Sequence, residues 1–213
     1  MLCSLFITGC FGQKSIEEKI FDVLEKVVAV EKDFEGQQDP LIKLAREEKK
    51  LYENILSIAT KDQDQVAKLA DEAIVIVKKR EVHLNEEIKS IEASEREFEK
   101  LNPLIGKLND KELEEQAEEL AEVMNKRYEI HRKLANFYLE GLALDTELYN
   151  MLKDKNRPDE NLQGKVILIN ETYDEVLQAN EKFTELTDTY NETKMSFYKV
   201  LGLKVSKKQT NNS

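Results

Sequence analysis

Apolar residues recur every three or four positions along almost the whole chain, and this spacing constrains the fold more than any other feature. The clearest stretch shows a seven-residue repeat: Leu162, Val166, Ile169, Tyr173, Val176, Phe183, Tyr190, Phe197 and Leu201. Such a repeat places apolar side chains on one helix face and favours coiled-coil packing. The 213 residues include only seven glycines and three prolines, too few for the turns of a sandwich, barrel or wound sheet. The pattern predicts an all-α protein.

Turn signals divide the chain into four helical arms. The capping-box pattern of Ser15 and Glu18 begins the first arm, which runs to about residue 60. It is broken near Gly36–Pro40, where Asp39 is a candidate N-cap and Pro40 fits the first position of a new helix. The first arm is therefore either kinked or a short hairpin.

The other arms are expected over about 62–101, from Asn109 to about 155, and over about 162–201. Turns of under ten residues favour antiparallel neighbours, so the sequence predicts an elongated, antiparallel up-and-down helical bundle with coiled-coil-like packing. At 1.5 Å per residue, an arm of about 40 residues is about 60 Å long. We expect residues 15–203 to form one domain and residues 204–213 a flexible polar tail.

Six polar residues interrupt the apolar stripes: Arg80, Glu87 and Ser94 in the second arm, and Asn180, Thr187 and Lys194 in the fourth. Such residues can form a polar groove for a ligand or polar layers that fix the register of a narrow core, and we expect layers. Around residues 134–152 the third arm is apolar on several faces, which predicts burial by more than one neighbour. Gly141 should allow another helix to approach closely there.

The residue patterns of common catalytic and metal sites do not occur in this sequence. Neither of the two histidines, His83 and His131, has a Glu three residues before it, as a di-iron bundle requires. The chain also lacks GxSxG, HExxH and glycine-rich phosphate loops. We therefore expect no enzyme activity and no cofactor, with His131 bonded to a carboxylate at the core edge and His83 exposed.

The net charge of −11 argues against a nucleic-acid partner, because phosphate binding needs clustered Lys and Arg. The basic cluster that the sequence shows is Lys204, Lys207 and Lys208, in the expected tail. We interpret it as a solubilising chain end.

The first ten residues, MLCSLFITGC, indicate export and lipid attachment. The apolar run before Cys10 is too short to span a bilayer but suits the core of a signal peptide. Ile7-Thr8-Gly9-Cys10 resembles the bacterial lipobox, in which the cysteine accepts a thioether-linked diacylglyceryl group and the chain is cut before it. This interpretation makes residues 1–9 a signal-peptide remnant, Cys10 the lipidation site and residues 10–14 a lipidated tether.

A different interpretation of this segment stays open, because no Lys or Arg precedes Lys14 as a signal peptide requires. The apolar residues could instead form an arm that packs on the bundle, with Cys10 an incidental thiol. Cys3, the other cysteine, lies in the same segment, so the two cysteines alone do not identify a compartment.

A lipobox, the segment SIEEKIFDVLEKVV and a long charged helical stretch together resemble the YkyA-type cell-wall-binding lipoproteins of Bacillus and relatives. The resemblance covers nearly the whole chain and carries over one functional residue, Cys10. It implies an envelope protein held by lipid on the outer face of the cytoplasmic membrane. Teichoic acids are polyanions and repel a protein of this charge beyond the Debye length of about 8 Å, so wall contact would need sugar recognition, divalent bridges or a protein partner.

We therefore expect a membrane-anchored, non-enzymatic spacer or interaction module, with an envelope protein or a cell-wall component as its partner. The alternative is a cytosolic coiled-coil scaffold with a packed apolar N-terminus. A third interpretation, a ligand-binding lipoprotein, predicts an aromatic-lined pocket in a chain that has no Trp. In the up-and-down order, the turns near Thr60 and Asn156 would lie away from the membrane and the tail would lie beside it.

Overall fold

The computed structural model describes residues 14–59, 62–155 and 158–202. Within these ranges the chain forms helices and connecting turns. Their order is α1 (Ile16–Val30), α2 (Lys32–Ile58), α3 (Gln63–Phe98), a 3₁₀ turn (Glu99–Leu101), α4 (Asn102–Ile105), α5 (Lys111–Lys153) and α6 (Asp159–Val200). The prediction of an all-α protein is confirmed.

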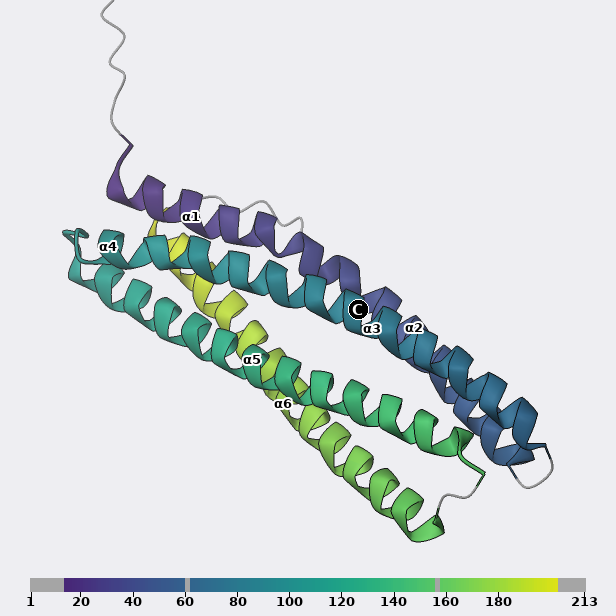
Figure 1. The fold of residues 1–213 in the computed structure, drawn as a ribbon. Helices are drawn as coiled ribbons and strands as arrows, with labels where there is room; N and C mark the ends of the chain where they lie inside the picture. Colours follow the sequence, from purple (N-terminus) through teal and green to yellow (C-terminus); the bar gives the residue numbers. More distant parts are fainter. Residues whose placement is uncertain (1–13, 60–61, 156–157, 203–213) are drawn as a thin grey trace, which may run out of the picture.

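The long helices form an elongated antiparallel bundle (Figure 1). α1 and α2 follow one another along α3, while α6 pairs with α5, and α3 and α5 join the two halves. One end of the rod, which we call the α4 end, carries the start of α1, the short α4 and the end of α6. The opposite end carries the α2–α3 and α5–α6 connections. The predicted up-and-down order is confirmed, and the first arm is kinked, not a hairpin.

The kink in the first arm lies at Glu31, so the predicted break at Gly36–Pro40 is wrong. Ser90 of α3 explains its position. The Ser90 hydroxyl donates to the Val30 carbonyl at 3.0 Å and accepts from the Phe34 amide at 3.1 Å. In a continuous helix these two backbone groups would bond each other, so the inserted hydroxyl satisfies both where the helix changes direction.

Pro40 lies inside α2, and Asp39 is a helical residue, not an N-cap. A proline at this position cannot donate to the carbonyl four residues earlier, which is that of Gly36. α2 continues past it because Leu41 and Ile55 are buried in the core on either side of the central turns of this helix. Packing therefore outweighs the local helix-breaking signal.

The predicted start of the first helix is confirmed. The Ser15 hydroxyl accepts from the Glu18 amide at 3.1 Å, and the Glu18 carboxylate accepts from the Ser15 amide at 2.9 Å. α5 begins one residue later than its sequence signal, because Asp110 and not Asn109 is the N-cap. The Asp110 carboxylate accepts from the Glu112 amide at 2.9 Å.

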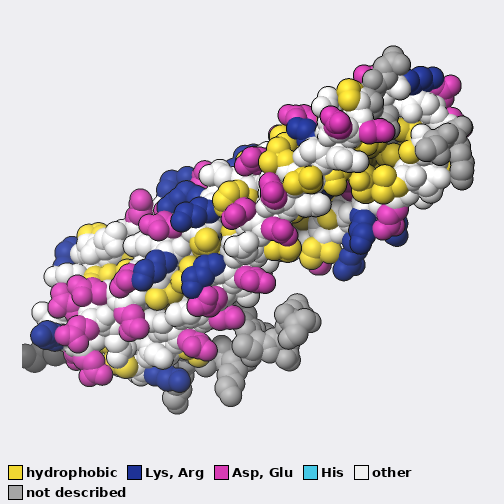
Figure 2. Space-filling model, turned by 90° about the horizontal axis from the view of Figure 1, so that it is seen from below, with side chains coloured by type: hydrophobic (Ala, Val, Ile, Leu, Met, Phe, Trp, Pro, Cys, Tyr) yellow, Lys and Arg dark blue, Asp and Glu magenta, His cyan; other side chains and the backbone are white. Residues whose placement is uncertain are grey.

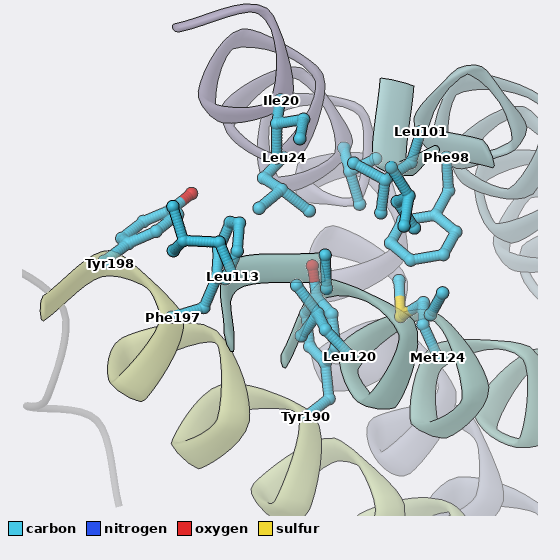
Figure 3. Close-up of a cluster of buried hydrophobic side chains, with 14 of the residues drawn as sticks. Ile20, Leu24, Phe98, Leu101, Leu113, Leu120, Met124, Tyr190, Phe197 and Tyr198 are labelled. Carbon is cyan, nitrogen blue, oxygen red and sulfur yellow. The ribbon is translucent and has the colours of Figure 1, made fainter. Parts of the chain in front are cut away.

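Three clusters of buried apolar side chains follow one another along the bundle. The cluster at the α4 end joins α1, α3, α5 and α6, and Figure 3 shows Leu24, Phe98 and Phe197 pointing toward one another within it. A small cluster contains Leu134 and Phe183, and a third joins α2, α3, α5 and α6. Buried polar side chains interrupt these clusters, as the interrupted stripes predict.

The second half of α5 is buried from two sides, as the sequence predicts, because α5 contacts both α3 and α6. Gly141 is buried in this stretch. A Cβ added at Gly141 would lie 3.0 Å from Cζ of Tyr173 on α6. Gly141 therefore leaves room for a close contact with α6, as predicted, and the Tyr173 ring makes this contact.

The surface differs between the two halves of the rod. On the face seen in Figure 2, apolar side chains gather over the half opposite the α4 end, while charged side chains of both signs cover the other half. Large apolar side chains that are more than two-fifths exposed include Ile42, Leu56, Val75, Val82, Ile167 and Leu177.

Candidate functional site

The predicted lipidation site, Cys10, lies outside the described residues, as do Cys3 and the tail lysines at 204, 207 and 208. The described chain begins at Lys14, whose Nζ lies 2.5 Å from the Asp22 carboxylate. α1 and α6 meet at the same end of the bundle, because the Tyr198 hydroxyl donates to the Glu25 carboxylate at 2.9 Å. The described parts of both chain ends therefore lie at the α4 end.

A cluster of polar side chains from four helices fills the middle of the bundle. We call it the Arg80 cluster, and it contains Arg80 of α3, Glu48 of α2, Tyr138, Asp145 and Tyr149 of α5, and Tyr173 of α6. Arg80 and Glu48 are only 6% and 5% exposed, so these charges depend on each other and on the surrounding hydroxyls for solvation.

Arg80 contacts every other member of the cluster except Tyr149. Its guanidinium donates to the Glu48 carboxylate, to the Tyr138 hydroxyl at 3.0 Å and to the Tyr173 hydroxyl at 3.2 Å. The same group lies 3.6 Å from the Asp145 carboxylate and 5.1 Å from the centre of the Tyr138 ring. Nε of Arg80 is buried without a hydrogen-bond partner among the described residues. The cluster thus ties α3 to three other helices through one side chain.

Asp145 is the member of this cluster whose pKa is shifted toward neutral pH. Burial raises the pKa of Asp145 to about 6, and the charge of Glu48 raises it as well. The hydrogen bond that Tyr173 donates and the charge of Arg80 act in the opposite direction. Above that pKa Asp145 places a second buried carboxylate beside the Arg80 guanidinium, and below it Asp145 is neutral.

A second polar cluster lies nearer the α4 end, at the level of the kink. We call it the Arg127 cluster: Arg127 and Tyr128 of α5, Glu31, Ser94 of α3 and Thr187 of α6. The Arg127 guanidinium donates to both carboxylate oxygens of Glu31, at 2.8 Å and 3.0 Å, and to the Thr187 hydroxyl at 2.9 Å. The Ser94 hydroxyl donates to Glu31 at 2.6 Å and lies 2.7 Å from the Tyr128 hydroxyl. Glu31 is thus fixed by α3 and α5 together.

The histidines occupy different environments. His131 is buried, with Nε2 at 3.1 Å from the Glu87 carboxylate, so the predicted carboxylate partner is confirmed. His83 is half-buried, not exposed as predicted, because Gln37 of α2 covers it and lies 2.7 Å from its Nδ1. The other oxygen of Glu87 accepts from Gln38 at 2.8 Å.

Most of the six polar stripe residues lie in the bundle interior and bond to neighbouring helices. Arg80, Glu87 and Ser94 are buried, and Thr187 and Lys194 are half-buried. Asn180 is exposed because Ala179 occupies the core position instead. These contacts support polar layers that set the register of the helices, in preference to a ligand groove.

Within residues 14–59, 62–155 and 158–202 there is neither a group of possible metal ligands nor a helix that is long and apolar enough to cross a membrane. In these ranges, no three His, Cys, Asp or Glu side chains are grouped so that they could hold a metal ion. None of the described helices combines the length and apolar character of a membrane span.

The chain matches known proteins over most of its length. Residues 15–200 match the model of the YkyA family, described as "Putative cell-wall binding lipoprotein". The uncharacterized lipoprotein YkyA of Bacillus subtilis (strain 168) is 31% identical over 204 residues, which cover 96% of this chain and 91% of that protein.

A crystal structure of a conserved protein of unknown function from Staphylococcus aureus superimposes with a TM-score of 0.73. The alignment covers 88% of this chain and 98% of that one, at 18% identity, so this likeness supports the fold alone. The match to the family model lies outside the N-terminal motif, and the alignment with the Bacillus relative covers 96% of this chain. The chain belongs to the YkyA family of lipoproteins.

Proposed function

We propose that this protein is a membrane-anchored envelope lipoprotein, which carries a diacylglyceryl group on Cys10 and acts as a non-enzymatic spacer or interaction module. Its place is the outer face of the cytoplasmic membrane. Membership in a lipoprotein family and the lipobox-like Ile7-Thr8-Gly9-Cys10 support this proposal. Two acyl chains give stable membrane attachment, whereas one is marginal.

The complete capping box at Ser15 supports this proposal in addition to the lipobox-like motif, because it marks where the first helix begins. Only residues 11–14 separate Cys10 from Ser15, and four residues span at most about 14 Å. A rigid helical bundle would therefore start close to the lipid. α5 has 43 residues, which corresponds to about 65 Å, so the far end of the rod can stand well away from the membrane.

The positions of the chain ends in the bundle predict how the rod would be oriented relative to the membrane. The start of α1 and the end of α6 both lie at the α4 end (Figure 1), so the α2–α3 and α5–α6 connections would point outward from the membrane. The tail lysines at 204, 207 and 208 would then follow α6 close to an anionic surface, where each contributes about 1 kcal/mol.

The buried polar side chains of the bundle agree with a non-enzymatic role, because they connect helices to one another. The Arg80 and Arg127 clusters bond side chains of different helices to one another. Such contacts hold helices in one register, which suits a stiff spacer.

The anchor is tested by comparing Cys10→Ser with Cys3→Ser in the native host. Cys10→Ser should move the protein from the detergent phase to the aqueous phase, or block its processing. Cys3→Ser is the matched control, since it removes a thiol from the same apolar segment and should leave partitioning unchanged. Mass spectrometry of the mature N-terminus should find the lipid on Cys10.

Equal partitioning of wild type and Cys10→Ser, with no lipid at the N-terminus, would reject the lipoprotein function. That result would favour the alternative of a cytosolic scaffold with a packed apolar N-terminus. Loss of partitioning in both variants would mean that the apolar segment, and not the lipid, holds the protein at the membrane.

A further inference from the structure

Five exposed cations of α2 and α3 lie at the same level of the bundle: Lys43, Arg46, Lys50, Lys78 and Lys79. We call them the basic patch. The buried contact between Glu48 and Arg80 fixes this level, because Arg46 and Lys50 flank Glu48 while Lys78 and Lys79 directly precede Arg80.

Helix geometry turns these cations outward. Glu48 and Arg80 point into the bundle, where they bond each other. A position two residues away on an α-helix is rotated by about 200°, so Arg46, Lys50 and Lys78 face away from the core. Lys43 lies seven residues before Lys50 and shares its face.

None of these five cations makes a hydrogen bond or ion pair with any described residue. Other basic residues of the bundle do: Arg132 with Glu95, Lys153 with Asp71 and Lys165 with Glu147. Within residues 43–50 and 78–81, the exposed charges are these five cations and Lys49, against Glu47 and Glu81. Six cations against two carboxylates leave this level of α2 and α3 positive, although the chain as a whole carries −11.

Apolar surface lies next to the cations. A shallow hollow on α3 is lined by Val75, Lys78, Lys79, Val82 and His83. The two valines are 52% and 60% exposed, so they offer contact area to a bound chain. Cations beside an apolar hollow suit a flexible polymer that carries spaced anionic groups on a carbon backbone.

We propose that the basic patch binds a phosphodiester polymer of the cell envelope, with the repeating phosphate chemistry of a teichoic acid. Lysine and arginine are the usual side chains for phosphate groups. This inference rests on the proposed function, because only an exported protein meets such a polymer. The net charge of −11 does not prevent such binding. Salt screens charges that lie more than about 8 Å away, so the positive charge of the basic patch dominates where the polymer makes contact.

The position of the patch favours a polymer over the membrane surface. Arg46 lies 31 residues after Ser15, which corresponds to about 45 Å along the first arm. The membrane potential falls off within a Debye length, so a rod standing on its anchor would hold the patch beyond its range.

The test uses the full-length chain with Cys10→Ser, so that binding does not depend on the lipid. Affinity for purified poly(glycerol phosphate) is measured by calorimetry at 50 and 300 mM salt. The patch variant combines Arg46→Gln, Lys50→Gln and Lys79→Gln. The control variant combines Lys107→Gln, Lys133→Gln and Lys199→Gln, which removes the same charge from exposed positions elsewhere on the bundle. Far-ultraviolet circular dichroism checks that each variant is folded.

Binding should weaken about 10- to 100-fold in the patch variant, change less than about 3-fold in the control variant, and fall with salt. Equal loss in both variants would overturn the proposal, because net charge alone would then explain binding. Absence of binding by the parent chain would also overturn it, while leaving the Cys10 anchor test unaffected. Tighter binding to phosphatidylglycerol vesicles than to the polymer, lost in the patch variant and kept in the control variant, would assign the patch to the membrane instead.

Discussion

Replacing Asp145 by Asn should stabilise the bundle at neutral pH and remove a pH dependence between about pH 4 and 6. The pKa of Asp145 is raised from 3.8 to about 6 by burial and by the neighbouring Glu48 charge. The folded chain therefore binds this proton more tightly than the unfolded chain does. Between the two pKa values, rising pH removes the proton from the unfolded chain first, so the stability contributed by this group falls.

The size of the effect follows from the shift. About two pH units correspond to about 3 kcal/mol, a cost that is fully present above pH 6 and absent below about pH 4. An Asn at this position keeps a carbonyl oxygen that accepts the hydrogen bond from Tyr173, and Arg80 keeps its partner Glu48. The variant therefore resembles the protonated wild type at every pH.

Urea unfolding followed by circular dichroism at pH 4.0 and pH 7.5 measures this difference. Asp145→Asn should exceed wild type by up to about 3 kcal/mol at pH 7.5, and the two should agree within about 0.5 kcal/mol at pH 4.0. Asp188→Asn is the control, since Asp188 is exposed on the same bundle and its replacement should matter little at either pH.

A lower stability of Asp145→Asn at pH 7.5 would refute this reasoning. The carboxylate would then be needed as a second partner of Arg80, which lies 3.6 Å away, and its charge would stabilise the fold. The same conclusion would follow from an equal difference between variant and wild type at both pH values.

Two further predictions concern packing and pairing inside the bundle. In the Asp145→Asn background, Glu48→Gln should lower the free energy of unfolding by about 3 kcal/mol, because it leaves the buried Arg80 charge without a carboxylate partner. Glu47→Gln in the same background changes an exposed neighbouring position and should alter the free energy by less than about 0.5 kcal/mol. Similar effects of the two variants in urea unfolding would contradict the importance of the buried pair. Gly141→Ala should destabilise the fold by about 1–3 kcal/mol, because the new Cβ would lie 3.0 Å from the Tyr173 ring of α6. A Cβ at Gly164 would have no atom within 4 Å, so Gly164→Ala should stabilise α6 by up to about 1 kcal/mol. Stabilisation of equal size in both alanine variants would show that the helices do not hold this close contact.

The sequence by itself determined the helical class, the order of the arms and most of their ends. Apolar periodicity acts along a single helix, so it is readable from one chain segment at a time. The capping box at Ser15 is likewise a local interaction, between residues three apart, and it forms as the sequence predicts. The buried stretch of α5 around Gly141 could be predicted for the same reason.

Local helix-breaking residues predicted the wrong position for the kink in the first arm. Pro40 and Gly36 mark a break by local rules, yet α2 continues through both of them. The kink lies at Glu31 because a hydroxyl from Ser90, on a different helix, takes over the backbone bonds there. No pattern within the first arm itself contains that information.

Only the tertiary structure decided which polar groups meet. Arg127 and Asp145 have the spacing of ordinary helical charges in the sequence, and they become cluster members because α5 is covered by α3 and α6 at their positions. Cys10, the predicted lipidation site, was inferred from a linear motif and not from the fold. The basic patch is the reverse case: its cations belong to two arms that run in opposite directions, and they lie at the same level of the bundle because the Glu48–Arg80 contact fixes the register between those arms.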